Sequence, residues 1–162
     1  MKIVVLVGSP KGDQSVTKHY VLYLQKKFPK HEFLFFNIAQ RIKKIEKNEE
    51  AFQDIIHEIE SSDAIIWAFP LYFLVVHANY KRFIELIFER KEAVDAFRGK
   101  YALAISTSIH FYDHTAHNYI HGICDDLEMK YFGRYSAGIS DLMKDDKREN
   151  FLKYASQFFD FV

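Results

Sequence analysis

The chain has 162 residues, of which 49% are hydrophobic, and its 22 basic side chains balance 22 acidic ones. This length and apolar content suit one globular domain spanning residues 1–162. The zero net charge gives no support to nucleic-acid binding, and the single cysteine, Cys124, excludes a disulfide framework or a cysteine-rich metal cluster. The sequence shows no secretory signal pattern and no apolar run that could span a bilayer, so we expect a cytoplasmic protein without membrane attachment.

Short apolar runs alternate along the chain with segments of helical periodicity. The runs predict five strands, at residues 3–7, 32–37, 64–69, 100–106 and 130–137. The segments between and after them predict five helices, at residues 15–28, 49–60, 78–90, 115–127 and 147–161. Residues 38–48 are polar and basic and are interpreted as a solvated connector, with contact to a nucleotide phosphate as the alternative. The alternation predicts an α/β fold, a flavodoxin-like doubly wound parallel sheet of order 2-1-3-4-5 with helices on both faces.

The first of the loops expected to carry function is residues 8–17, GSPKGDQSVT, between a strand and a helix. A helix N-terminus offers unpaired N–H groups and positive dipole, and Lys11, Ser15 and Thr17 add donors, so the loop favours an anion. It lacks both G-x-G-x-x-G and G-x-x-x-x-G-K-[ST], which argues against a dinucleotide pyrophosphate or a Walker A site. A terminal phosphomonoester fits it best. The alternative is an ordinary turn in which Ser15 only caps the helix.

Two further loops belong to the same edge of the predicted sheet, where ligands of such folds bind. Residues 69–76, FPLYFLVV, stay apolar where loops are normally polar. They predict a wall for a flat ring or a subunit interface, or else an extension of the core beneath the next helix. Residues 106–113, STSIHFYD, mix hydroxyls, aromatic rings and a histidine, a set that can contact the edge of a planar heterocycle.

The loops at 8–17 and 69–72, with YKRFIE at 80–85, resemble those of the NAD(P)H-dependent FMN reductases, which include the flavin domain of iron–sulfur flavoproteins. The resemblance covers essentially the whole chain and implies FMN as cofactor and NAD(P)H as co-substrate. By this resemblance, the residues holding the FMN phosphate are Ser9, Lys11, Ser15, Val16 and Thr17. Those lining the isoalloxazine and ribityl chain are Pro70, Leu71, Tyr72 and Phe73. Those meeting the other edge of the ring are Ser106, Thr107, Ser108, His110 and Tyr112.

The chain departs from the family pattern at three points. His77 and Ala78 stand where the family has a Met-Pro-like helix start, and Ile109-His110-Phe111 replaces common glycines. The clustered cysteines of iron–sulfur flavoproteins are absent, so no Fe–S cluster is expected. The bulky third loop is expected to reshape access to the ring. No side chain is assigned a catalytic role, because the flavin would carry the chemistry.

Four histidines at residues 110, 114, 117 and 121 recur at spacings of four, three and four. If a helix begins near His114, the last three share one stripe and suggest zinc as an alternative ligand. The preferred interpretation is a polar helix face with one histidine, His110, at the flavin site, and no metal.

The leading hypothesis is an FMN-dependent NAD(P)H oxidoreductase that passes electrons to a small acceptor such as a flavin or quinone. The alternative is a flavodoxin-like electron carrier or a non-catalytic flavin-binding module. Because known carriers of that kind are strongly acidic, the neutral charge of this chain favours the enzyme. The resemblance implies a homodimer or homotetramer, with residues 74–76 and the helix at 78–90 as a contact surface, and no nucleic-acid or membrane partner.

Overall fold

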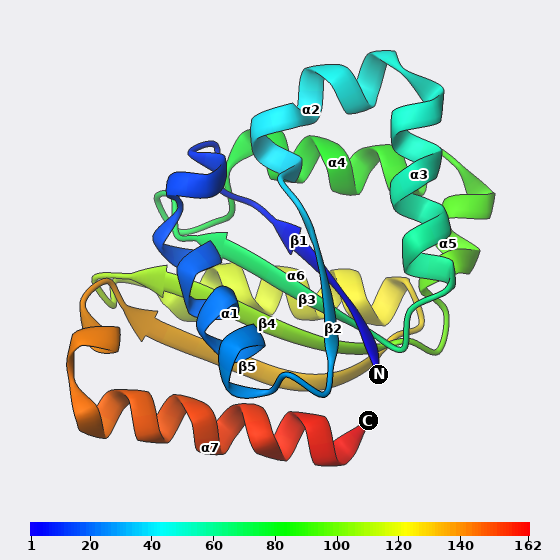
Figure 1. Cartoon of the computed structure of the whole chain (residues 1–162). Coiled ribbons are helices and arrows are strands. Elements are labelled where there is room, and N and C mark those ends of the chain that lie inside the picture. The colour runs from blue at the N-terminus through cyan, green and yellow to red at the C-terminus, as the bar shows by residue number, and fades with distance from the viewer.

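A five-stranded parallel sheet forms the centre of the computed structural model, which describes all of residues 1–162 (Figure 1). The strand order is β2-β1-β3-β4-β5, and every neighbouring pair is parallel. The strands are β1 (Lys2–Val7), β2 (Glu32–Phe36), β3 (Ala64–Pro70), β4 (Tyr101–Ser108) and β5 (Lys130–Gly138). The predicted flavodoxin-like order 2-1-3-4-5 is therefore confirmed.

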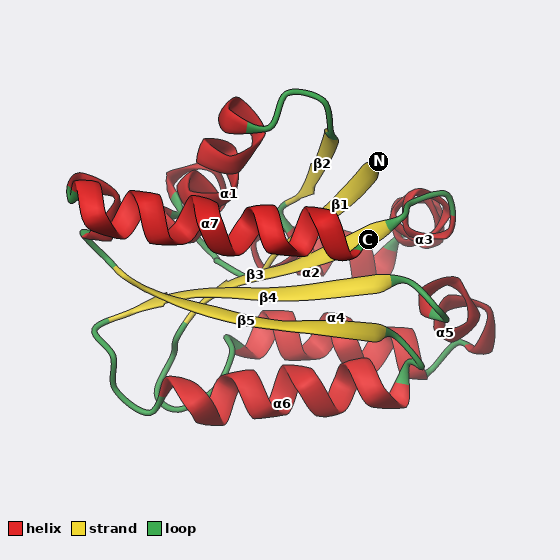
Figure 2. Ribbon diagram, turned by 90° about the horizontal axis from the view of Figure 1, so that it is seen from below, coloured by secondary structure: helices red, strands yellow, loops and turns green.

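Helices cover both faces of this sheet, as Figure 2 shows: α1 and α7 lie on one face, and α4 and α6 on the other. The helices are α1 (Val16–Lys27), α2 (Ile38–Lys47), α3 (Glu49–Glu60), α4 (Ala78–Phe88), α5 (Lys91–Phe97), α6 (Asp113–Asp126) and α7 (Asp145–Phe161). Two short 3-10 turns, η1 (Gly12–Gln14) and η2 (Asp141–Met143), precede α1 and α7. None of the helices combines the length and the apolar character needed to cross a membrane.

Strand β1 shows how the two cores arise from one segment. Its side chains alternate between the faces of the sheet. Val4 and Leu6 join the core beneath α2 to α6, whereas Ile3 and Val5 join the core beneath α1 and α7. All four are fully buried. A strand covered on both faces needs apolar residues at every position. Burial of each Val, Leu or Ile side chain stabilises the fold by about 1.5–3 kcal/mol, which favours the central position of β1.

The prediction of a solvated connector at residues 38–48 is wrong, because this segment forms helix α2. Its apolar residues Ile38, Ile42 and Ile45 recur at helical spacing and are buried. The cations between them occupy the exposed face, and their number concealed the apolar stripe in the sequence. Helix α5 was also not predicted; it is short, and Ala93, Ala96 and Phe97 bury one of its sides. Several elements are longer than expected; near the site, β4 runs on to Ser108 and α6 begins at Asp113.

Candidate functional site

The carboxyl ends of β1, β3 and β4 surround a cavity of about 490 Å³. This is the size and the place in a parallel sheet at which small ligands bind. Three loops from well-separated parts of the chain form most of its walls, and Ile139, just after β5, adds to them. Its lining consists of Ser9, Lys11, Ser15, Val16, Thr17, Pro70, Leu71, Tyr72, Phe73, Leu74, Thr107, Ser108, Ile109, Phe111 and Ile139. Lys11 is the only charged residue among them.

The N-terminus of α1 forms the polar end of the cavity. Ser15 caps the helix, since its hydroxyl accepts a 3.3 Å hydrogen bond from the N–H of Lys18. The main-chain N–H groups of Val16 and Thr17 have no acceptor within the chain. The buried Thr17 hydroxyl lies 2.6 Å from that of Thr107, which ties the helix start to β4. Unpaired N–H groups at a helix N-terminus, with hydroxyls beside them, form a site for an anion.

Close packing explains the glycine that begins this loop. The N–H of Gly8 donates to the carbonyl of Ala68, at 2.7 Å, and so joins the loop to β3. A Cβ atom at Gly8 would lie 2.7 Å from Cδ1 of Tyr80 and 2.9 Å from Cβ of Phe69. Tyr80 cannot withdraw easily, because it is fully buried and its hydroxyl donates to the carbonyl of Leu6 at 2.7 Å. Position 8 therefore has room only for hydrogen.

The second loop forms the apolar wall through a tight turn. Tyr72 and Val75 exchange two main-chain hydrogen bonds, of 2.9 and 3.1 Å. Between them Phe73 and Leu74 have φ of 32° and 74°, which are unfavourable for residues other than glycine. The turn leaves the Phe73 side chain 87% exposed at the mouth of the cavity. His77, one of the departures from the family pattern, caps α4: its Nδ1 accepts from the N–H of Asn79 at 3.1 Å.

The third loop is held by the carboxylate of Asp113, the first residue of α6. Its Oδ2 accepts hydrogen bonds from the hydroxyls of Ser108, at 2.7 Å, and Ser136, and lies 3.2 Å from Nδ1 of His110. Burial acts to raise the pKa of Asp113, but the bonds from Ser136, Ser108 and His110 outweigh it and leave that pKa below its usual value. His110 and Tyr112 have φ of 60° and 55°. The anchored carboxylate thus maintains a strained loop conformation.

Most of the residues singled out in the sequence come together in the cavity, but three do not. Ser106 is fully buried, and its hydroxyl lies 2.8 Å from Nε2 of His117. His110 and Tyr112 line a separate hollow of about 340 Å³ together with Arg134. Of the other residues of the cavity, Leu74, Ile109 and Phe111 belong to the two predicted ring loops without having been singled out individually, and Ile139 lies outside the predicted loops.

Alternation explains this division. Along β4, Ser106 and Thr107 point to opposite faces of the sheet, so Thr107 meets α1 and Ser106 meets α6. In the third loop the apolar Ile109 and Phe111 alternate with the polar residues between them, and it is the apolar set that reaches the cavity. This alternation is visible in the sequence, but the side on which each set lies is not.

His110, His114 and His117 line the same hollow, but their side chains are not placed to hold a metal ion together, so the arrangement does not support the zinc alternative. His117 is buried, and burial, together with nearby Arg134, lowers its pKa to about 4. His121 instead stacks on Tyr131, with ring centroids 4.3 Å apart. No group of three or more His, Cys, Asp or Glu side chains is placed to hold a metal ion.

Solved structures with a similar fold include flavin enzymes. The apo form of an NADH:FMN oxidoreductase (EMOB) has a TM-score of 0.77 and 16% sequence identity, over 97% of this chain and 87% of that one. The flavoenzyme NAD(P)H:(acceptor) oxidoreductase FerB of Paracoccus denitrificans has a TM-score of 0.65 and 21% identity, over 82% and 75% of the two chains. General stress protein 14 of Treponema denticola, solved in complex with FMN, has a TM-score of 0.69 and 13% identity, over 99% of each chain.

At these identities the likeness to solved structures establishes the fold alone, and no curated protein matches the sequence significantly. The family comparison goes further. The model of the NADPH-dependent FMN reductases matches residues 1–141, which include all three loops of the cavity. The chain therefore belongs to the NADPH-dependent FMN reductase family and is an NAD(P)H-dependent flavin oxidoreductase with FMN as its cofactor.

Proposed function

We propose that FMN binds in the cavity at the carboxyl edge of the sheet and that the protein uses it to reduce a small planar acceptor, such as a flavin or quinone, with NAD(P)H. The observation that carries the proposal is the division of the cavity into two ends. Unpaired N–H groups of Val16 and Thr17 lie at one end, and apolar side chains from two loops form the other. A phosphomonoester joined to a flat ring has the same division.

The polar end fits a phosphate in charge as well as in hydrogen bonding. Ser9, Ser15 and Thr17 supply hydroxyls, and Lys11 supplies a positive charge. Because no carboxylate lines the cavity, nothing there opposes a dianion. The positive end of the α1 dipole adds to this preference.

The apolar end fits a ring. Pro70 and Leu71 come from the second loop and Ile109 and Phe111 from the third, so a flat group bound there would contact apolar side chains from both loops. Ser106, His110 and Tyr112 are not part of this proposal, since they lie outside the cavity.

When bound, FMN supplies the redox chemistry, taking a hydride from the nicotinamide and giving electrons to the second substrate. The protein's own part is to bind and orient. No His, Asp, Glu or Cys lines the cavity, so we assign no side chain to proton transfer. The exposed aromatic rings of Phe73 and Phe111 at the mouth favour a planar second substrate, because aromatic rings stack.

We further propose that the protein is a homodimer or homotetramer. We also propose that it acts in the cytoplasm, where its reductant NAD(P)H is available. Large apolar side chains that line the cavity remain exposed at its mouth: Phe73 is 87% exposed and Ile109 81%. Patches of this kind mark contact surfaces. Of the residues expected to form the contact, Val75 is exposed, whereas Val76 is buried within its own subunit.

The proposal is tested with the purified protein and its absorbance spectrum. FMN should bind and show its band at about 450 nm, and NAD(P)H should bleach that band. Replacing both Ser9 and Thr17 with alanine should weaken FMN binding at least tenfold. Serine in place of alanine at position 17 of this double variant should restore part of the lost affinity. Ser156→Ala, on α7, is the matched control. A colourless protein that ignores added FMN would contradict the proposal, and a yellow protein that never oxidises NAD(P)H would favour a flavin-binding module without turnover.

A further inference from the structure

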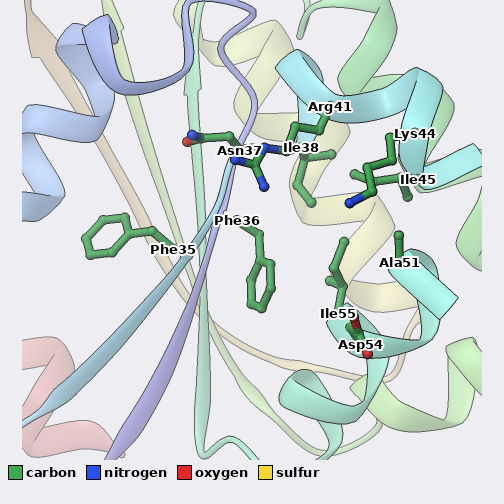
Figure 3. A pocket seen from close by; sticks show the side chains of 10 residues that line it. All are labelled: Phe35, Phe36, Asn37, Ile38, Arg41, Lys44, Ile45, Ala51, Asp54 and Ile55. Carbon is green, nitrogen blue, oxygen red and sulfur yellow. The ribbon is translucent and has the colours of Figure 1, made fainter.

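A second cavity lies beside the edge strand β2, enclosed by the end of that strand and by α2 and α3 (Figure 3). Its volume is about 200 Å³, and no residue lines both it and the flavin cavity. It is therefore a separate site and not an extension of the first. Neither the family nor the proposed reaction accounts for it.

Apolar side chains form much of its wall. Figure 3 shows Phe36 turned toward Ile55, whereas Phe35 turns to the other side of the strand. Ile38 and Ile45 of α2 complete this surface. A dry cavity of about 150 Å³ is enough to hold benzene, so this one accommodates a group of that size.

Two cations, Arg41 and Lys44, lie one turn apart on α2 and both line the cavity. In Figure 3 the Arg41 head group reaches back toward Asn37 and Phe36, and the Lys44 ammonium points into the space that α2 and α3 enclose. Neither side chain forms an ion pair or a hydrogen bond within the chain. Every other arginine has such a partner: Arg82, Arg90, Arg98, Arg134 and Arg148.

The N-terminus of α2 adds to the positive potential. Asn37, the residue before the helix, makes no capping bond to it, because its side chain pairs instead with Asp13 and Lys18. The N–H groups of Ile38, Ala39 and Gln40 consequently have no acceptor within the chain. Uncapped N–H groups beside two cations favour an anion. Asp54 of α3 is the one carboxylate of the cavity, and it forms no ion pair with either cation.

We propose that this cavity binds a small organic anion that carries one acidic group on an apolar body about as large as a benzene ring. The acidic group lies between Arg41 and Lys44, near the start of α2. The apolar body packs against Phe36 and Ile55. Asp54 opposes a second negative charge, so a monoanion is preferred. The site serves an effector or a second small-molecule ligand, since it shares no residue with the flavin cavity.

Benzoate is the probe that tests this, added to protein saturated with FMN so that the first cavity is filled. Amide signals of Ile38, Lys44 and Ile55 should shift in a nuclear magnetic resonance titration, with a Kd on the order of a millimolar for so small a ligand. Benzyl alcohol and inorganic phosphate, which each lack one half of the recognised chemistry, should bind at least tenfold more weakly.

Variants of exposed residues separate the site from general charge effects. Arg41→Gln combined with Lys44→Gln should weaken benzoate at least tenfold, and Asp54→Asn should tighten it severalfold. Lys47→Gln removes a charge from the same helix but does not line the cavity, so it should leave the affinity unchanged. The proposal is overturned if benzoate shifts none of these signals, if the double variant binds it as well as the unaltered protein, or if benzyl alcohol binds equally well. Because FMN binding is measured separately, failure here leaves the proposed function standing.

Discussion

The hydroxyl of Ser108, at the end of β4, donates a 2.7 Å hydrogen bond to the carboxylate of Asp113, at the start of α6. The same hydroxyl accepts a 2.8 Å bond from the N–H of His110, so the two residues close the third loop on itself. Ser108 lines the flavin cavity and Asp113 lines the hollow behind it. This pair therefore holds the loop in the position that directs Ile109 and Phe111 into the flavin cavity.

We predict that Asp113→Asn destabilises the fold and loosens this loop. The amide presents N–H groups where Ser108, Ser136 and His110 now donate to a carboxylate. Losing a charged hydrogen bond costs about 1.5–3 kcal/mol of the free energy of unfolding, which urea denaturation measures. FMN binding should weaken as well. Asp126→Asn, exposed at the other end of α6, should have a small or stabilising effect because it removes a negative charge from the helix C-terminus. Equal stability of Asp113→Asn and the unaltered protein would show that the carboxylate does not anchor the loop.

We predict that the free energy of unfolding decreases as the pH is lowered, because of His117. Its pKa in the folded protein is about 4, whereas an unfolded histidine has about 6.5. Between these values the unfolded chain binds a proton that the folded protein does not, so acid favours unfolding. The loss between pH 7 and pH 4 should reach about 3 kcal/mol. His117→Gln should flatten this part of the profile, leaving the contribution of His31, whose pKa is also lowered by burial. A profile that His117→Gln leaves unaltered would contradict the assignment.

Gly8 and Gly122 should respond in opposite ways to replacement by alanine. Gly8→Ala places a methyl group against Tyr80 and Phe69 and should cost about 1–3 kcal/mol of stability, with weaker FMN binding because the phosphate loop shifts. Gly122 lies within α6 with nothing within 4 Å of an added Cβ. Gly122→Ala should therefore stabilise the protein by about 0.5–1 kcal/mol. Thermal denaturation of both variants measures these changes in stability. The prediction is wrong if Gly8→Ala is as stable as the unaltered protein.

Phe73→Glu should weaken self-association. The side chain is 87% exposed within one subunit, so the replacement costs the isolated subunit little. In a contact between subunits it would bury a charge, and dissociation should rise at least tenfold by sedimentation equilibrium. Gln157→Glu introduces the same charge on α7 and should leave association unchanged. A protein that is monomeric without any substitution would refute the proposed oligomer.

The strands and most helices could be predicted because their signals are local. A run such as Ala64–Phe69 is apolar at every position, and only a strand covered on both faces requires that. The first loop could be predicted for the same reason, because a strand, a glycine turn and a helix start are consecutive in sequence. Helix α2 was missed because four cations outweigh three isoleucines in composition, although their spacing is helical.

The sequence by itself determined the order of strands and helices and the polar character of the phosphate loop, since both depend on residues adjacent along the chain. Tertiary structure alone decided that Ile109 and Phe111 face the flavin cavity while His110 and Tyr112 face away, because Asp113 and two left-handed residues set the direction of that loop. It also created the second cavity, whose walls, Phe36, Arg41 and Ile55, belong to three elements that meet only in the folded protein.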